Sequence, residues 1–241
     1  PGTSWAGSIA ACMEYPHNRP YTADDLVRII TLLRDPVNGC PWDKVQTHTS
    51  IRMNFLEEAY EAVDALDLDD PVLMCEELGD VLMQVAFHTC MEQETGRFTW
   101  EQVCDGVCQK LIERHPNIFG TQPGYEGITD WDALKNKEKG RRTLADDLES
   151  VPRAMPALMR AAKLQKRAAR HGAALQGADA AALADAAENL QTAQPASAQA
   201  EQAVGELLFA AANLARQAGV DPEQALQKAN EAFCTAAGPV A

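Results

Sequence analysis

The sequence lacks long apolar runs and paired cysteines. Charged residues interrupt its apolar stretches well before the roughly 18 residues that a membrane-spanning helix needs, and no apolar signal core follows a basic start. We therefore expect a cytoplasmic protein with no membrane partner. The seven cysteines are odd in number and form no CxxC pair, which favours reduced, mainly buried thiols over a disulfide framework.

Basic residues are also scarce. The sequence has 21 Lys and Arg residues against 35 Asp and Glu residues, so its formal net charge is −14. A chain this acidic repels the phosphate backbone of duplex nucleic acid, and we expect no such partner. The same excess of carboxylates suits a protein that binds divalent cations.

Runs of alternating β-branched residues, which would indicate strands, are missing as well. Apolar residues at helical spacing predict helices over residues 22–34, 50–66, 72–94 and 99–114, and a more polar helix over 130–141. Thr22 is placed to cap the first helix, and residues 35–42, DPVNGCPW, are typical of a turn. The sequence therefore predicts an all-α fold.

The chain contains a weak internal repeat. Gly79–Met83 (GDVLM) is echoed by Gly205–Phe209 (GELLF), and Trp100–Val103 is echoed by Pro222–Ala225. Two related helical units in tandem explain both the repeat and the length of the chain. Together with a shift to alanine-rich composition, the repeat predicts an N-terminal extension over 1–20, a first unit over 21–145, a linker over 146–160 and a second unit over 161–241.

Two acidic motifs of the same spacing stand on consecutive predicted helices. Glu57, Glu58 and Glu61 form EExxE, and Glu76, Glu77 and Asp80 form EExxD. At about 100° per residue, each triplet falls within one arc of its helix, and helices joined by a short loop pack antiparallel. The two clusters can then face each other with hard cations such as Mg²⁺ or Mn²⁺ between them, and Gly79 would allow close approach of the helices.

The competing interpretation is an ordinary solvated face. An apolar stripe of Leu56, Ala59, Tyr60 and Val63 lies nearly opposite the glutamates, as on a surface helix. For one motif alone, the solvated face would be the better interpretation. The same triplet on the adjacent helix favours the cation site.

Two cationic pairs and a tryptophan turn complete the candidate site. Lys110 with Arg114, and Trp131 with Lys135, are spaced i, i+4, so each pair projects from one helix face towards the phosphates of a metal-bound polyphosphate. Alternatively, Lys110 and Arg114 form a solvated helix end. Trp42 could stack on a nucleobase while Asp43 reads the edge of that base, or Trp42 could be a core residue that anchors the turn.

These residues together resemble the MazG family of nucleoside triphosphate pyrophosphohydrolases. The resemblance rests on GCPWD at Gly39–Asp43, LEEAYE, EELGD, KxxxRHPxxF at Lys110–Phe119 and WxxxK at Trp131–Lys135. It covers about 105 of the 241 residues, from Leu33 to Glu138, and the tandem layout extends it to the whole chain.

The resemblance implies a helical bundle that hydrolyses a nucleoside triphosphate to the monophosphate and pyrophosphate with Mg²⁺, and that assembles as a dimer. By position, the metal ligands would be Glu58, Glu61, Glu77 and Asp80, with Glu57 orienting or activating water. The residues that hold the phosphates would be Lys110, Arg114, Trp131 and Lys135.

The second unit departs from these motifs. Where the first unit has EEAYE and EELGD, the second reads Asp185–Asn189 (DAAEN) and Gln202–Glu206 (QAVGE), and Ala232 and Ala236 match Lys110 and Arg114. We therefore expect the first unit to carry all turnover in nucleotide-pool clearance or control. The alternative is a catalytically silent nucleotide-binding or scaffold protein of the same fold.

Overall fold

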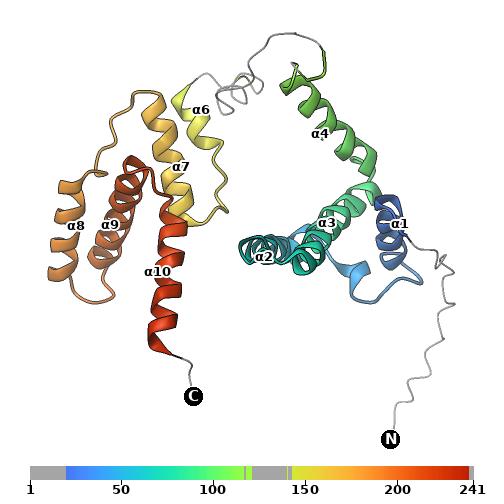
Figure 1. The fold of residues 1–241 in the computed structure, drawn as a ribbon, viewed down its shortest axis with the longest axis horizontal. Coiled ribbons are helices and arrows are strands. Elements are labelled where there is room, and N and C mark those ends of the chain that lie inside the picture. The colour runs from blue at the N-terminus through green and yellow to red at the C-terminus, as the bar shows by residue number, and fades with distance from the viewer. Residues whose placement is uncertain (1–19, 117, 121–139, 141–142, 239–241) are drawn as a thin grey trace, which may run out of the picture. The chain divides into compact units, whose positions relative to one another are not determined.

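The computed structural model describes residues 20–116, 118–120, 140 and 143–238. Its secondary structure in those ranges is helical, with turns and no strand (Figure 1), so the all-α prediction is confirmed. The chain divides into two compact units, Pro1–Gly127 and Ile128–Ala241. The predicted linker over 146–160 falls inside the second unit of this division. None of the described helices is long and apolar enough to cross a membrane.

The first unit contains a short 3₁₀ helix and longer α-helices close to the predicted ranges. They are α1 (Ala23–Leu33), η1 (Asp43–Val45), α2 (His48–Asp67), α3 (Pro71–Glu94) and α4 (Trp100–Arg114). Side-chain caps set the helix starts: the hydroxyls of Thr22, Thr47 and Thr99 accept backbone N–H groups in capping boxes, and Asp70 caps α3 directly before a proline. The predicted helix over 130–141 lies almost entirely outside the described residues.

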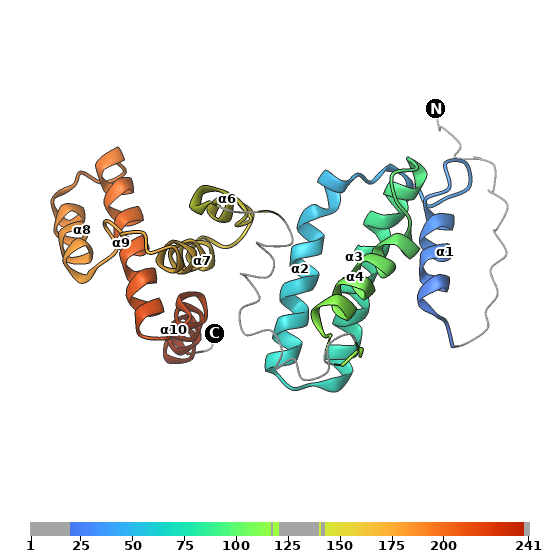
Figure 2. The same ribbon diagram turned by 90° about the horizontal axis from the view of Figure 1, so that it is seen from above.

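Helix α3 is the centre of the first unit. Figures 1 and 2 show α2 on one side of it and α1 on the other, and α4 contacts it as well. The core gathers at one end of α3, where the three large buried side chains Phe87, Met91 and Trp100 pack with Ile30 and Ile51. Burial of these side chains fixes the rotation of α2 and α3 about their axes, and hence which residues face the seam between them.

The second unit repeats this plan. Its helices are α6 (Leu144–Glu149), α7 (Ala157–Arg170), α8 (Ala180–Thr192), α9 (Ala198–Gln217) and α10 (Pro222–Ala237). Helix α9 contacts α7, α8 and α10, just as α3 contacts α1, α2 and α4. The core is built from small side chains, because Ala178, Ala186, Ala203, Ala210 and Ala212 are all buried.

Helix α6 overlaps the start of the predicted linker over 146–160 and was not expected. It is held on α7 by Asp147, whose carboxylate lies 2.9 Å from a guanidinium nitrogen of Arg167 and 3.2 Å from the ring of His171. Arg167 also donates to the Asp147 carbonyl oxygen and to the hydroxyl of Ser150. With Asp147 only 1% exposed, this ion pair belongs to the interior of the second unit.

The cysteine prediction is half right. The six cysteines in the described ranges are free thiols, but Cys90 alone among them is buried. Cys75, Cys108 and Cys234 are exposed on helix surfaces. An apolar neighbourhood in the sequence therefore did not identify the buried face of these helices.

Candidate metal centre

Carboxylates from α2 and α3 meet in the seam between the two helices. Glu58, Glu77 and Asp80 are half-buried, and each offers an oxygen that lies within 4.8 Å of the others. Their positions follow a seam that runs through Ile51, Glu58, Ala62 and Ala65 on α2 and through Glu77, Asp80, Gln84, Phe87 and Met91 on α3. The spacing of about 3.5 residues keeps these positions facing the partner helix.

The close approach of the three carboxylates changes their acidity. Partial burial, followed by the negative charge of Asp80, raises the pKa of Glu58 above its ordinary value. Desolvation and the charge of Glu61, with a smaller contribution from Asp80, raise the pKa of Glu77. Both shifts come from repulsion and lost solvation, which a divalent cation between the oxygens would offset.

Glu61 and Glu57 occupy different positions around this cluster. Glu61 is exposed but interacts with Glu58 on its own helix and with Glu77 across the seam, so it borders the cluster. Glu57 is exposed and is not a member of the group whose oxygens come together. The structure thus brings together three of the four predicted metal ligands and places the fourth beside them.

Gln84 is a member of the site that the sequence interpretation missed. It lies one helical turn after Asp80, is 7% exposed, and its Nε2 donates to Glu58 at 3.4 Å. Its Oε1 is buried without a hydrogen-bond partner in the described part of the chain. A neutral amide gives no charge signal, but its i+4 spacing from Asp80 could have placed it on the same face.

The solvated-face interpretation holds for Glu57, Glu61 and Glu76, which are exposed, but not for Glu58 and Glu77, which are half-buried. Tyr60 and Val63, from the apolar stripe that this interpretation would bury, are 54% and 50% exposed. The role expected for Gly79 is wrong, because a Cβ at this position would meet no atom within 4 Å. Helices α2 and α3 therefore approach each other through the seam residues and not over a glycine.

The turn over residues 35–46 is fixed to the core by Arg34. Its guanidinium binds both carboxylate oxygens of Glu94, at 2.5 and 2.8 Å, and donates to the carbonyl oxygens of Asp43 and Gln46. Inside the turn, a Cβ on Gly39 would lie 2.4 Å from the Asp35 carbonyl oxygen, so glycine is required there. The turn is thereby a rigid support for the residues it carries.

Trp42 on this turn is 56% exposed. The interpretation of Trp42 as a core residue is therefore wrong, and its ring is accessible to a stacking partner. Asp43 begins η1 next to it and is half-buried.

The cationic residues predicted to hold phosphates are only partly described. Lys110 is exposed on α4 and forms no ion pair with any described residue, and Arg114 is half-buried at the end of that helix. Trp131 and Lys135 lie outside the described residues. The structure therefore provides the carboxylates and the turn, whereas the meeting of the cations with them stays a prediction.

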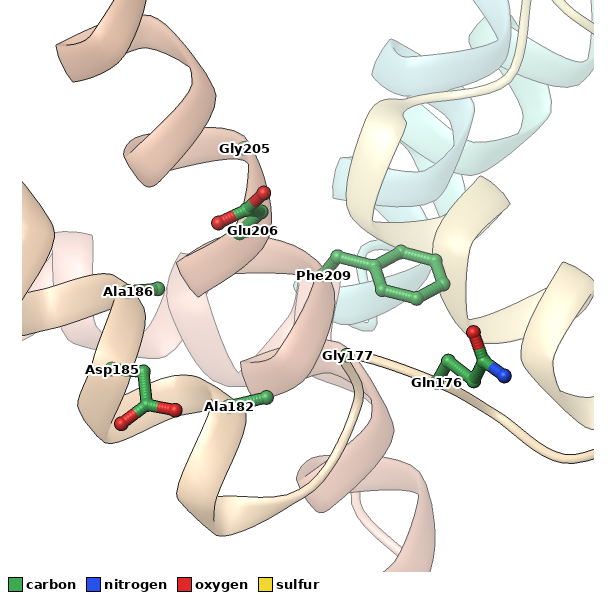
Figure 3. A pocket seen from close by; sticks show the side chains of 8 residues that line it. All are labelled: Gln176, Gly177, Ala182, Asp185, Ala186, Gly205, Glu206 and Phe209. Atoms are coloured by element: carbon green, nitrogen blue, oxygen red, sulfur yellow. The ribbon is translucent and has the colours of Figure 1, made fainter.

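The second unit has an open cavity where the first unit has its carboxylates. The cavity measures about 670 Å³, and Figure 3 shows Asp185 and Ala186 of α8 on one wall with Glu206 and Phe209 of α9 on another. In the repeat, Ala186 stands where Glu58 does, and Ala203 where Glu77 does. No group of three possible metal ligands occurs among the described residues of the second unit.

Comparison with known proteins leads to the same family as the sequence motifs. A family model described as the MazG nucleotide pyrophosphohydrolase domain matches residues 46–119, which span α2 to α4. A nucleoside triphosphate pyrophosphohydrolase of Escherichia coli is 41% identical over 219 residues, covering 87% of this chain and 83% of the relative. The nucleoside triphosphate pyrophosphohydrolase/pyrophosphatase MazG of Thermotoga maritima is 39% identical over 212 residues, covering 87% and 82%.

Proposed function

The chain belongs to the MazG family of nucleoside triphosphate pyrophosphohydrolases, and we propose that its first unit hydrolyses nucleoside triphosphates to the monophosphate and pyrophosphate. The observation that carries this proposal is the meeting of Glu58, Glu77 and Asp80 within 4.8 Å in the seam between α2 and α3. The second unit, which lacks such a cluster in its described part, would support the fold without turnover.

The donor set fits a hard divalent cation. Glu58, Glu77 and Asp80 offer carboxylate oxygens alone, and Glu61 adds a fourth carboxylate at the border of the cluster. Oxygen ligation of this kind selects Mg²⁺ or Mn²⁺. Such an ion, when bound, would neutralise the triphosphate and polarise the bond to be broken.

The residues of the chain would divide the remaining work. Glu57, exposed next to the cluster, would orient or activate the attacking water. Lys110, Arg114 and Lys135 would hold the β and γ phosphates as the leaving unit, with Trp131 beside them. Trp42 would stack on the base and Asp43 would read its edge. The rigid turn set by Arg34 supports this last assignment.

The test of the reaction is to identify its products. Incubation with a panel of nucleoside triphosphates and Mg²⁺ should release pyrophosphate and monophosphate, and diphosphates should be poor substrates because they lack the two-phosphate leaving unit. Chelation of the cation should abolish turnover. Release of orthophosphate from a triphosphate would contradict the proposal, and tight nucleotide binding without any turnover would favour the silent binding protein instead.

We also propose that the first unit pairs with a second copy of the chain. Tyr60, Val63 and Leu66 are half-exposed on α2, and Leu111 and Ile112 on α4 are exposed to a similar degree. Apolar surface of this extent is typical of an interface. Light scattering should give the mass of a homodimer, and a monomer with full activity would contradict this part of the proposal.

A further inference from the structure

The second unit has a cavity that its decayed motifs do not explain. It measures about 530 Å³ and lies between α7 and the turn from α9 to α10. Lys163 and Lys166 of α7 and Arg216 of α9 line it, with Asp221 as the single acidic residue in the lining. This cavity is distinct from the one that replaces the carboxylate cluster, because the two share no lining residue.

The charge of this region is opposite to that of the whole chain. Helix α7 carries five cations and no acidic residue, whereas its counterpart α1 carries two aspartates and a single arginine. The formal charge of the chain is −14. Cations gathered in one hollow of an acidic protein repel each other and create a local potential that attracts anions.

The acidic residues at the cavity accept backbone N–H groups and pair with neither lysine. Asp221 caps α10 by accepting the backbone N–H groups of Glu223 and Gln224, at 2.9 and 3.0 Å. The Glu223 carboxylate accepts the N–H of Met159 at 3.3 Å. Neither Lys163 nor Lys166 forms an ion pair with a described residue, so the charges of both lysines are available to a ligand.

Arg216 is fixed in position before any ligand arrives. Its Nε and one terminal nitrogen donate to Asn213 Oδ1 at 3.0 and 2.8 Å, and Asn213 donates to the Ala178 carbonyl oxygen at 2.6 Å. Asn213 is 2% exposed, so this chain of hydrogen bonds is anchored in the interior. The second terminal nitrogen of Arg216 has no partner in the described part of the chain and can donate to an anion without an ordering cost.

We propose that the second unit binds the phosphate chain of a small molecule in this cavity. Two lysines and an oriented arginine suit the negatively charged phosphate oxygens of a pyrophosphate or nucleotide. The side chains of Met155, Met159 and Val220 form an apolar wall beside the cations, which a base or sugar can cover. The site is separate from the reaction of the first unit and does not depend on it.

The test uses amide hydrogen exchange of the full chain in chelator, so that no metal-dependent binding occurs in the first unit. Inorganic pyrophosphate and a nucleoside monophosphate are added separately, and sulfate at equal ionic strength serves as the control. We expect exchange in residues 155–166 and 216–222 to slow about threefold or more with one or both phosphate probes. A larger effect with the nucleotide would identify the apolar wall as part of the site, and a larger effect with pyrophosphate would identify an inorganic ligand.

Matched variants decide which residues carry the binding. Lys163→Gln with Lys166→Gln should remove the protection, whereas Arg153→Gln with Lys228→Gln changes the net charge equally at exposed positions outside the cavity and should leave it intact. Protection that survives the first pair, equal protection by sulfate, or none with either probe would overturn the proposal. Because turnover is not measured, an inactive first unit would leave this result unaffected.

Discussion

The two units share a helix plan but differ at the seam of their central helix pair. Where the first unit has half-buried Glu58 and Glu77, the second has buried Ala186 and Ala203. Helix α8 thus packs on α9 without the carboxylates that α2 and α3 bring together. The comparison teaches that the carboxylates are not needed for the fold. Lost solvation and mutual repulsion, which raise the pKa values of Glu58 and Glu77, disfavour their charged forms when no cation is bound.

The two units also differ in what a buried arginine binds at the end of α1 and of its counterpart α7. Arg34, after α1, binds Glu94 and the carbonyl oxygens of the turn that carries Trp42 and Asp43. Arg167, in the last turn of α7, binds Asp147 of α6 instead. The first arginine supports a candidate site, and the second attaches a short helix.

The largest expected effect is the loss of activity when a carboxylate of the first unit is replaced. Asp80→Asn should lower kcat about a thousandfold, because the amide keeps the shape of the side chain but weakens cation binding. Its melting temperature should not fall, since a repelling charge is removed. Steady-state kinetics with Mg²⁺ measure the effect, and activity near that of the natural sequence would contradict the site assignment.

Substitution of Arg167 should mainly reduce stability, whereas substitution of Arg34 should mainly reduce activity. Arg167→Gln leaves the buried Asp147 carboxylate with His171 as its remaining cationic neighbour and should reduce the free energy of unfolding by about 3 kcal/mol, with turnover unchanged. Arg34→Gln should be milder for stability, because its partner Glu94 is 45% exposed, but should lower kcat/KM about tenfold as the turn loosens. Denaturant unfolding and kinetics on both variants would test this, and equal losses of activity would remove the distinction.

The cation should alter the pH dependence of stability. The pKa values of Glu58 and Glu77 are higher in the folded protein, so in the metal-free protein their contribution to stability is full below the ordinary glutamate pKa and is lost as pH rises through the raised values. Mg²⁺ at a hundredfold excess over its Kd should stabilise the folded state by about 2.7 kcal/mol at pH 7. Thermal melts with Mg²⁺ and with chelator measure both effects, and Glu77→Gln should reduce them.

The smallest effect is expected from the acidic residues of the second unit. Glu188→Gln together with Glu206→Gln should leave turnover within about threefold, because neither residue belongs to a metal-binding group. If this double variant lost activity as completely as Asp80→Asn, the second unit would be part of the active site.

The sequence predicted those features that depend on residues close together in the chain, such as helix caps and the spacing of acidic residues. Thr22 predicted the start of α1 because a threonine hydroxyl caps within three residues, and the equal spacing of EExxE and EExxD led to the carboxylates that the structure brings together. The repeat likewise predicted a second helical unit related to the first, and α9 contacts α7, α8 and α10 as α3 contacts α1, α2 and α4.

Other features depend on contacts that a single segment does not encode. Tyr60 and Val63 belong to an apolar stripe whose spacing is typical of a core-facing surface, yet they are 54% and 50% exposed, whereas Glu58 is half-buried between α2 and α3. Gln84 carries no charge and drew no attention, although it binds Glu58 across the seam. Helix α6 spans six residues, too few for periodicity to reveal, and depends on an ion pair with a distant arginine.

The alanine core of the second unit sets which mutations each unit tolerates. Ala178, Ala186, Ala203, Ala210 and Ala212 are all at most 2% exposed, and trimming one methyl group forfeits about 0.8 kcal/mol, whereas inserting a larger side chain costs about 1–3 kcal/mol through overpacking. In the first unit, shortening Phe87 or Met91 would instead open a cavity at a cost of about 2–5 kcal/mol. After random mutagenesis and selection for folded protein, substitutions by larger residues should therefore be rare in the core of the second unit. Substitutions by smaller residues should be rare in the core of the first unit.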